Sequence, residues 1–170
     1  MTIKLPYLLA VTVAVLCVIY FTTSKGLSAA PPTTITTFDS VRHDLAGGKT
    51  RLVTFYSPDC PFSRHDAAGL NSLQSRFGDQ PFDVIAVAMS YNKMEDIAHF
   101  TEAQQTAYRM AHDTDGSVAS AFRNVRFTPT SFLIDESGRI VWRHTGRIPV
   151  EKVGSRISAL LQEPTLALSQ

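Results

Sequence analysis

The sequence feature that most constrains the fold is a pair of apolar runs, Leu52–Tyr56 and Asp83–Met89, separated by a segment with helical periodicity. Short, nearly continuous apolar runs are typical of central strands that are buried on both faces. The segment between them repeats its apolar residues at helical spacing, at Ala67, Leu70, Leu73 and Phe77. A strand–helix–strand unit of this kind predicts an α/β fold with a central sheet.

The segments that follow predict a mixed sheet with helices on both faces. A loop at 135–138 joins two short apolar runs and indicates an antiparallel hairpin. A short helix is also expected over Phe38–Leu45, ended by Gly47 and Gly48. The remaining expected elements are a helix over Asn92–Thr106 capped by Asn92, a strand over Tyr108–His112, a helix over Ser117–Phe122, hairpin strands over Ser131–Ile134 and Arg139–Trp142, and a last helix with Val150, Val153, Ile157, Leu160 and Leu161 on one face.

The N-terminal region contains Leu5–Phe21, a run of 17 residues without a charge. Its length is at the lower limit for a membrane span and just above that of a signal-peptide core. An uncleaved anchor, which the length favours, and a cleaved signal both remain open. The weak charge bias from Lys4 predicts that the domain lies outside the cytoplasm, on the periplasmic side, or is secreted to the periplasm if the segment is cleaved.

The domain organisation follows from these boundaries. We expect residues 1–27 to form the anchor or signal segment and residues 41–170 to form one domain. Residues 28–40 are rich in Pro, Thr and Ala and show no core pattern, so they are expected to form a stiff linker.

The composition removes several classes of function. A net charge of +1 provides no general field that would attract nucleic acid. His43, His99, His112 and His144 lack metal-ligand spacing, and no phosphate-binding loop is present, so neither a metal nor another cofactor is expected. Asp113 and Asp115 are expected to act as turn and cap residues, and Trp142 as a packing residue.

Cys60 is the residue whose position carries the most chemical information. It is the only cysteine outside the N-terminal run, because Cys17 lies within that run. It follows the first apolar strand after a short turn and precedes Pro61, which suits the first turn of a helix. The N–H groups and dipole at a helix start stabilise a thiolate, the reactive form of cysteine. Arg64 would add to this effect and Asp59 would oppose it, while a buried, inert cysteine is the alternative.

A second segment, Phe127–Asp135 (FTPTSFLID), places Pro129 at a strand start or edge, because proline cannot donate to a sheet ladder. Together with the turn at 60–63 and the longer stretch HDTDGSVASAFRNVRFTPTSFLIDESGRIVWRHTG, it resembles the TlpA-like, membrane-anchored thiol–disulfide oxidoreductases of the bacterial envelope. The resemblance covers roughly Val41 to Gln162 and implies a thioredoxin-like fold.

The resemblance also implies roles for individual residues. Cys60 would be the attacking cysteine, Pro129 would have a cis peptide bond beside it, and the backbone of Thr128 would meet the substrate. Pro61 and Phe62, in the same turn as Cys60, would also contact the substrate. His65 is expected to be a solvated side chain rather than a base for Cys60, because pairing with the thiol depends on geometry.

Two departures from the family pattern concern the site itself. Asp59 stands where the family usually has tryptophan, and Ser63 stands where it usually has a second cysteine. Attack by Cys60 would therefore give a mixed disulfide that no neighbouring thiol could release. An outside thiol, or the second cysteine of the substrate, would have to do so. Ser63 is then expected to donate a hydrogen bond to the Cys60 thiolate.

Three functions are compatible with these observations. The first is a thiol–disulfide oxidoreductase that works through Cys60 alone and forms mixed disulfides with protein or small-thiol partners. The second is a redox-inactive binding module that uses the groove beside Pro129. The third is a one-cysteine peroxidase, for which the spacing of Pro58 two residues before Cys60 is a poor match.

Overall fold

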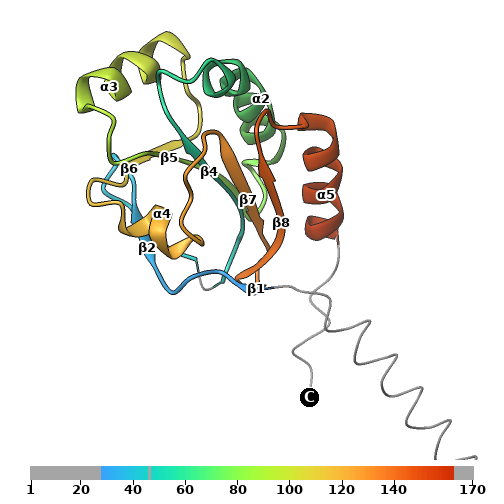
Figure 1. The fold of residues 1–170 in the computed structure, drawn as a ribbon. Helices are drawn as coiled ribbons and strands as arrows, with labels where there is room; N and C mark the ends of the chain where they lie inside the picture. Colours follow the sequence, from blue (N-terminus) through green and yellow to red (C-terminus); the bar gives the residue numbers. More distant parts are fainter. Residues whose placement is uncertain (1–27, 46, 163–170) are drawn as a thin grey trace, which may run out of the picture.

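The computed structural model describes residues 28–45 and 47–162 and shows a central sheet flanked by helices (Figure 1). β4 (Thr50–Tyr56) pairs in parallel with β5 (Phe82–Ala88) and antiparallel with β7 (Thr130–Ile134), so the sheet is mixed, as predicted. The strand order is β1-β8-β7-β4-β5-β6, with β1 at Ser28–Ala29, β6 at Arg109–His112 and β8 at Arg139–Thr145. The first apolar run of the sequence therefore lies inside the sheet.

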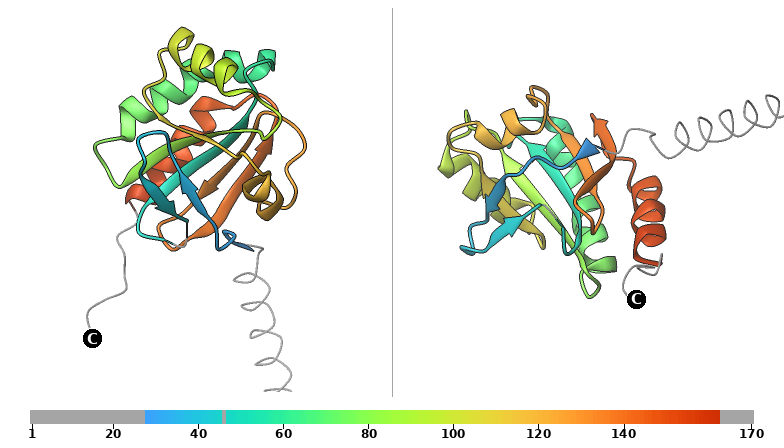
Figure 2. Two further views of the ribbon diagram at one scale, coloured as in Figure 1. Left: turned by 90° about the vertical axis from the view of Figure 1, so that its left-hand side faces the viewer. Right: turned by 90° about the horizontal axis from the view of Figure 1, so that it is seen from below.

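Alternate residues of β4 and β5 contribute to two cores, one on each face of the sheet. α2 (Pro61–Phe77), α3 (Met94–Ala103) and α5 (Val150–Gln162) supply residues to the first core, and Trp142 packs against it as expected. α4 (Ser117–Ala121) and the residues after it supply the second core. Figure 2 shows the β2–β3 hairpin and α5 on opposite sides of the sheet. The prediction of helices on both faces is confirmed.

The prediction of a short helix over Phe38–Leu45 is wrong. β2 (Thr34–Thr36) and β3 (Arg42–Asp44) form an antiparallel hairpin instead. The central residue of each strand, Ile35 or His43, is buried, and its two neighbours are exposed. This alternation with a period of two matches a strand on the surface of a core and does not match a helix.

The segment 28–40, expected to be a linker, also belongs to the folded domain. β1 pairs with β8, and the N–H of Ala30 donates to the carbonyl of Gly138 at 2.7 Å. Ala30 and Ile35 are both buried in the second core. The prediction missed these contacts because a two-residue and a three-residue strand are too short to show a periodic pattern.

The helix expected over Asn92–Thr106 is shorter in the structure, where α3 begins at Met94 and ends at Ala103. The N-cap residue of α3 is Lys93, so the prediction that Asn92 caps this helix is wrong. The Asn92 side chain is buried and donates to the hydroxyl of Ser57. The prediction for Asp113 is confirmed, since its carboxylate accepts from the N–H groups of Val118 and Ala119 at the start of α4.

Within residues 28–45 and 47–162, no helix is long and apolar enough to cross a membrane. The run Leu5–Phe21, predicted to be an anchor or signal, lies outside the described residues.

Ile35→Ala should lower the free energy of unfolding by about 2–5 kcal/mol, because it removes buried methyl groups from the second core. Thr36→Ala is the matched control, since Thr36 is exposed on the same strand and its truncation should cost less than about 1 kcal/mol. Denaturant unfolding of both variants provides the measurement. Equally small losses for both would show that the hairpin is not packed on the domain.

Candidate active site

Cys60 lies at the carboxyl end of β4, where the chain turns into α2. The turn is closed by the N–H of Cys60, which donates to the Ser57 carbonyl at 3.1 Å. Cys60 occupies the N-cap position with extended backbone angles, and Pro61 is the first residue of the helix, as predicted. Cys60 is partly exposed, so its sulfur is accessible to a partner while the helix start lies beneath it.

The loop before β7 brings Pro129 to the same place. The Thr128–Pro129 peptide bond is cis, as the resemblance implied. The thiol of Cys60 donates to the Thr128 carbonyl at 3.3 Å, although 68 residues separate the two in the chain. The structure thus brings together Cys60, Thr128 and Pro129, which the sequence could connect only through the resemblance.

The surroundings of Cys60 lower the pKa of its thiol below the ordinary value. Burial of the sulfur is the largest influence and raises the pKa. It is outweighed by hydrogen bonds to the thiolate from the N–H groups of Ser63 and Phe62 and from the side chains of Ser63 and Thr128. The two N–H groups are free donors of the first turn of α2, so the helix start has the effect expected of it.

Ser63 fills the position where the family usually has a second cysteine. Its side chain is only 3% exposed, so it lies below the surface of the site. Its hydroxyl oxygen accepts from the N–H of Ser57 at 3.4 Å, which leaves its own proton free to point to Cys60. The role predicted for Ser63 as a donor to the thiolate is consistent with this arrangement.

Two residues of this network, Ser57 and Asn92, were not predicted. The Asn92 amide donates to the Ser57 hydroxyl at 2.9 Å, and both side chains are buried. The N–H of Ser57 in turn donates to Ser63, so Asn92, in the loop after β5, supports the turn that carries Cys60. One signal was available in the sequence. Ser57 and Asn92 each follow a buried parallel strand, and the carboxyl ends of parallel strands meet at one edge of a sheet.

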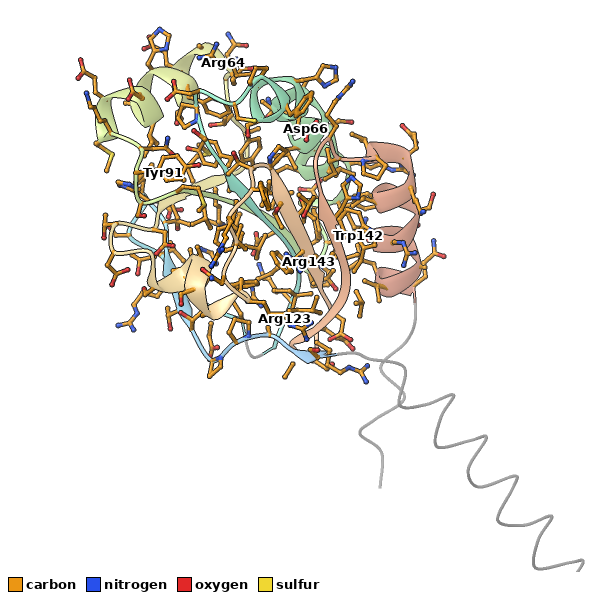
Figure 3. All side chains as sticks on the ribbon, viewed as in Figure 1. Arg64, Asp66, Tyr91, Arg123, Trp142 and Arg143 are labelled. Atoms are coloured by element: carbon orange, nitrogen blue, oxygen red, sulfur yellow. The ribbon has the colours of Figure 1, made fainter. Side chains whose placement is uncertain are left out.

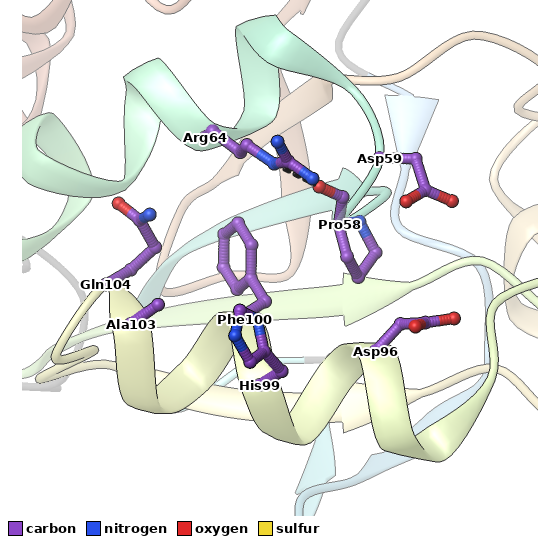
Figure 4. Close-up of a pocket in the computed structure, with 8 residues that line it drawn as sticks. All are labelled: Pro58, Asp59, Arg64, Asp96, His99, Phe100, Ala103 and Gln104. Atoms are coloured by element: carbon purple, nitrogen blue, oxygen red, sulfur yellow. Dashed lines mark hydrogen bonds between the residues drawn. The ribbon is translucent and has the colours of Figure 1, made fainter.

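Arg64 is directed to the turn before Cys60, where its Nε–H donates to the carbonyl of Pro58 at 2.7 Å, as drawn in Figure 4. The hydrogen bonds that lower the pKa of Cys60 come from Ser63, Phe62 and Thr128, and the charge effect expected of Arg64 stays a prediction. The sequence could place Arg64 one helical turn after Cys60, but it could not give the direction of its side chain.

His65 and Asp66 have hydrogen-bond partners other than Cys60. The exposed ring of His65 is hydrogen-bonded to the guanidinium of Arg147, which agrees with the prediction of a solvated side chain. Asp66 is buried, which raises its pKa, and its carboxylate accepts from the N–H of Ile148 at 2.8 Å. Figure 3 shows Arg64 and Asp66 at separate positions along α2. Asp66 therefore joins α2 to the loop before α5.

The surface around Cys60 carries two exposed aromatic side chains. Phe62 follows Cys60 by two residues and is 54% exposed, and Phe127 directly precedes Thr128 and is 72% exposed. Large exposed apolar side chains are common at surfaces that bind partners. In the part of the chain that the structure describes, no three His, Cys, Asp or Glu side chains are grouped so as to hold a metal ion.

A mixed sheet, with a cysteine at the start of the helix after a central strand and a cis-proline opposite, defines a thioredoxin-like protein. The chain belongs to the AhpC/TSA family, whose model matches residues 28–143.

Similar proteins of known activity support the same class. The chain is 24% identical over 135 residues to the thiol-disulfide oxidoreductase ResA of Geobacillus kaustophilus, and the aligned region covers 78% of this chain and 76% of ResA. It is also 24% identical over 128 residues to the thiol-disulfide oxidoreductase YkuV of Bacillus subtilis, and that aligned region covers 72% of this chain and 84% of YkuV. A crystal structure from Chlorobium tepidum, provisionally described as the thiol:disulfide interchange protein DsbE, matches with a TM-score of 0.71 at 25% identity and covers 79% of this chain and 96% of its own.

Ser63→Ala should raise the pKa of Cys60, because it removes one donor to the thiolate and leaves the burial of the sulfur in place. The thiolate fraction at neutral pH should fall, and alkylation by iodoacetamide should slow several-fold. The rate measured against pH reports the midpoint directly. Ser72→Ala, exposed on the same helix, is the matched control and should leave the midpoint unchanged. An unchanged midpoint in Ser63→Ala as well would contradict the role given to its hydroxyl.

Proposed function

We propose that this protein is a thiol–disulfide oxidoreductase that works through Cys60 alone. The observation that carries this function is a thiol of lowered pKa at a helix start, beside Thr128 and the cis-proline Pro129. A lowered pKa increases the fraction of thiolate at neutral pH, and the thiolate is the species that attacks disulfides. The thiol-disulfide oxidoreductases among the similar proteins support the same chemistry.

The reaction begins with attack of the Cys60 thiolate on one sulfur of a partner disulfide. A bond forms between Cys60 Sγ and that sulfur, the partner's S–S bond breaks, and the other partner sulfur leaves as a thiolate. The product is a mixed disulfide. Cys60 is the only cysteine among the described residues, and Ser63 stands where a second thiol could attack. Release therefore requires a thiol from solution or a second cysteine of the partner.

Ser63 has a different part in this scheme from that of a resolving cysteine. Its hydroxyl donates to the thiolate and so stabilises Cys60 both before attack and after release. A hydroxyl cannot displace a sulfur from a disulfide at neutral pH, because its oxygen stays protonated. The site therefore keeps the activated nucleophile and lacks an internal route for release.

An extended segment of a partner protein is the substrate that suits this surface. Thr128 precedes Pro129 at the start of β7, where its backbone lies next to the sulfur. Pro61 and the exposed Phe62 follow Cys60 directly at the start of α2, and the exposed Phe127 directly precedes Thr128 in the loop. A strand-like peptide with apolar residues near its cysteine would contact both aromatic side chains.

The protein incubated with oxidised glutathione should accumulate one adduct on Cys60, which mass spectrometry with peptide mapping would locate. Reduction of a protein disulfide should be slow unless a small thiol is added to release this adduct. Ser63→Cys should form an internal disulfide and gain turnover, because residues three apart at a helix start lie within the range of a disulfide. Ser72→Cys is the matched control, since it adds a thiol to the same helix out of reach of Cys60.

The outcomes separate the three functions. Repeated turnover by the unchanged protein without any added thiol would refute the single-cysteine mechanism. Failure of Cys60 to form an adduct with any disulfide would favour a binding module, in which Cys60→Ala should keep partner binding. Fast oxidation of Cys60 by hydrogen peroxide, with slow reaction toward disulfides, would favour a one-cysteine peroxidase.

We further infer that the domain lies outside the cytoplasm, attached through residues 1–27 or released after their removal. The uncharged run Leu5–Phe21, with Lys4 before it, supports this placement. Protease added to intact spheroplasts of a bacterium expressing the full chain should digest the domain, and a cytoplasmic marker should survive. A domain that is cleaved only after lysis would exclude an external location.

A further inference from the structure

A cavity of about 280 Å³ lies between the active-site turn and α3 (Figure 4). Pro58 and Asp59, the two residues before Cys60, line one wall together with Arg64 from α2. Residues of α3, including Asp96 and Phe100, line the other. The chain on both sides of Cys60 therefore borders this cavity, while the sulfur itself is hydrogen-bonded toward the β7 side of the turn.

The cavity is lined by charges of both signs. Figure 4 shows Asp59 and Asp96 on opposite walls at one side of the cavity, with the guanidinium of Arg64 beside Pro58. Phe100, 5% exposed, and the buried Pro58 add an apolar surface next to these charges. The hydrogen bond from Arg64 Nε to the Pro58 carbonyl holds the guanidinium at the rim. Among the described residues, Arg64 forms no ion pair with Asp59 or Asp96. Its guanidinium and the two carboxylates are therefore available to a ligand.

This arrangement indicates the chemistry of a ligand. A guanidinium binds a carboxylate with paired hydrogen bonds, and two carboxylates favour an ammonium group. The volume lies just under the range of about 300–1,000 Å³ that is typical of pockets for drug-sized ligands. A molecule the size of an amino acid or a short peptide, with a carboxylate and an ammonium group, fits both the charge and the volume.

We propose that this cavity binds a low-molecular-weight thiol that carries an amino-acid group, and presents its sulfur to Cys60. The inference rests on the proposed function, because it supplies the outside thiol that the absence of a second cysteine demands. It assigns two surfaces to one sulfur. The Thr128–Pro129 side receives the protein substrate, and the Arg64–Asp96 side receives the small thiol.

The balanced reaction uses two molecules of the small thiol. The first, as a thiolate, attacks Cys60 Sγ of the mixed disulfide, so that the protein substrate leaves with its cysteine reduced and Cys60 becomes bonded to the small thiol. The second attacks the small-thiol sulfur of that adduct, and Cys60 leaves as a thiolate. The small thiol is oxidised to its symmetric disulfide, and its two protons pass to the two cysteines of the substrate.

Four symmetric disulfides test the ligand chemistry on the full chain. Cystine carries both charged groups, cystamine only the ammonium, dithiodipropionate only the carboxylate, and bis(2-hydroxyethyl) disulfide neither. The rate of adduct formation on Cys60 is divided by the rate for the neutral disulfide, so that changes in the reactivity of the thiol cancel. Cystine should exceed the neutral disulfide by about tenfold, since hydrogen bonds to charged groups are worth about 1.5–3 kcal/mol.

Two variants identify the residues. Arg64→Gln should remove the advantage of the carboxylate in cystine and dithiodipropionate, and Asp96→Asn should reduce the advantage of the ammonium in cystine and cystamine. Arg156→Gln, which removes an exposed charge on α5, is the matched control and should leave all ratios unchanged. Far-UV circular dichroism checks that each variant is folded.

The results distinguish a failure of the small-thiol site from a failure of the proposed oxidoreductase function. Equal rates for all four disulfides would overturn the small-thiol site and leave the proposed function intact. No adduct with any disulfide would overturn the proposed function itself. A preference for dithiodipropionate alone, lost in Arg64→Gln and unaffected in Asp96→Asn, would show a simple anion effect and overturn the amino-acid ligand.

Discussion

The site depends on the way β4 is paired on its two edges. On one edge it runs parallel to β5, and on the other it runs antiparallel to β7. The carboxyl ends of β4 and β5 and the amino end of β7 therefore meet at one edge of the sheet. The turn with Cys60, the loop with Asn92 and the cis-proline Pro129 follow or precede these ends directly. Their proximity is a consequence of strand direction, with no need for a long loop to bring them together.

The polar groups under the sulfur form a continuous buried support. Asn92 holds the Ser57 hydroxyl, the Ser57 N–H holds Ser63, and Ser63 donates to Cys60. Buried hydrogen bonds of this kind resist rearrangement, so they support the turn and the thiolate, although the Oδ1 atom of Asn92 is left without a partner among the described residues. A cysteine at position 63 would exchange part of this support for a second thiol. In the proposed function, the chain keeps an activated sulfur and an outside thiol provides release.

The two sides of the active-site turn differ in chemical character. Toward β7 the sulfur contacts the backbone carbonyl of Thr128, and the residue before Thr128 is the exposed Phe127, which together suit an extended peptide. Toward α3 the turn borders a small cavity lined by Arg64 and Asp96, which suit a compact charged molecule. This division suits the proposed reaction with two unlike partners, in which one sulfur would be bonded first to a protein and then to a small thiol.

The sequence by itself determined the central elements and the start of the site. β4, α2 and β5 were predictable because buried strands and an amphipathic helix of this length have clear periodic patterns, and Pro61 marked the beginning of α2. Tertiary structure decided the β2–β3 hairpin, because three residues are too few for a sequence pattern to distinguish a strand from a helix. It also decided the contact of Asn92 with Ser57 and the direction of Arg64 toward Pro58. Side-chain direction and contacts between distant segments depend on how the strands are ordered, and a local pattern carries no information about that order.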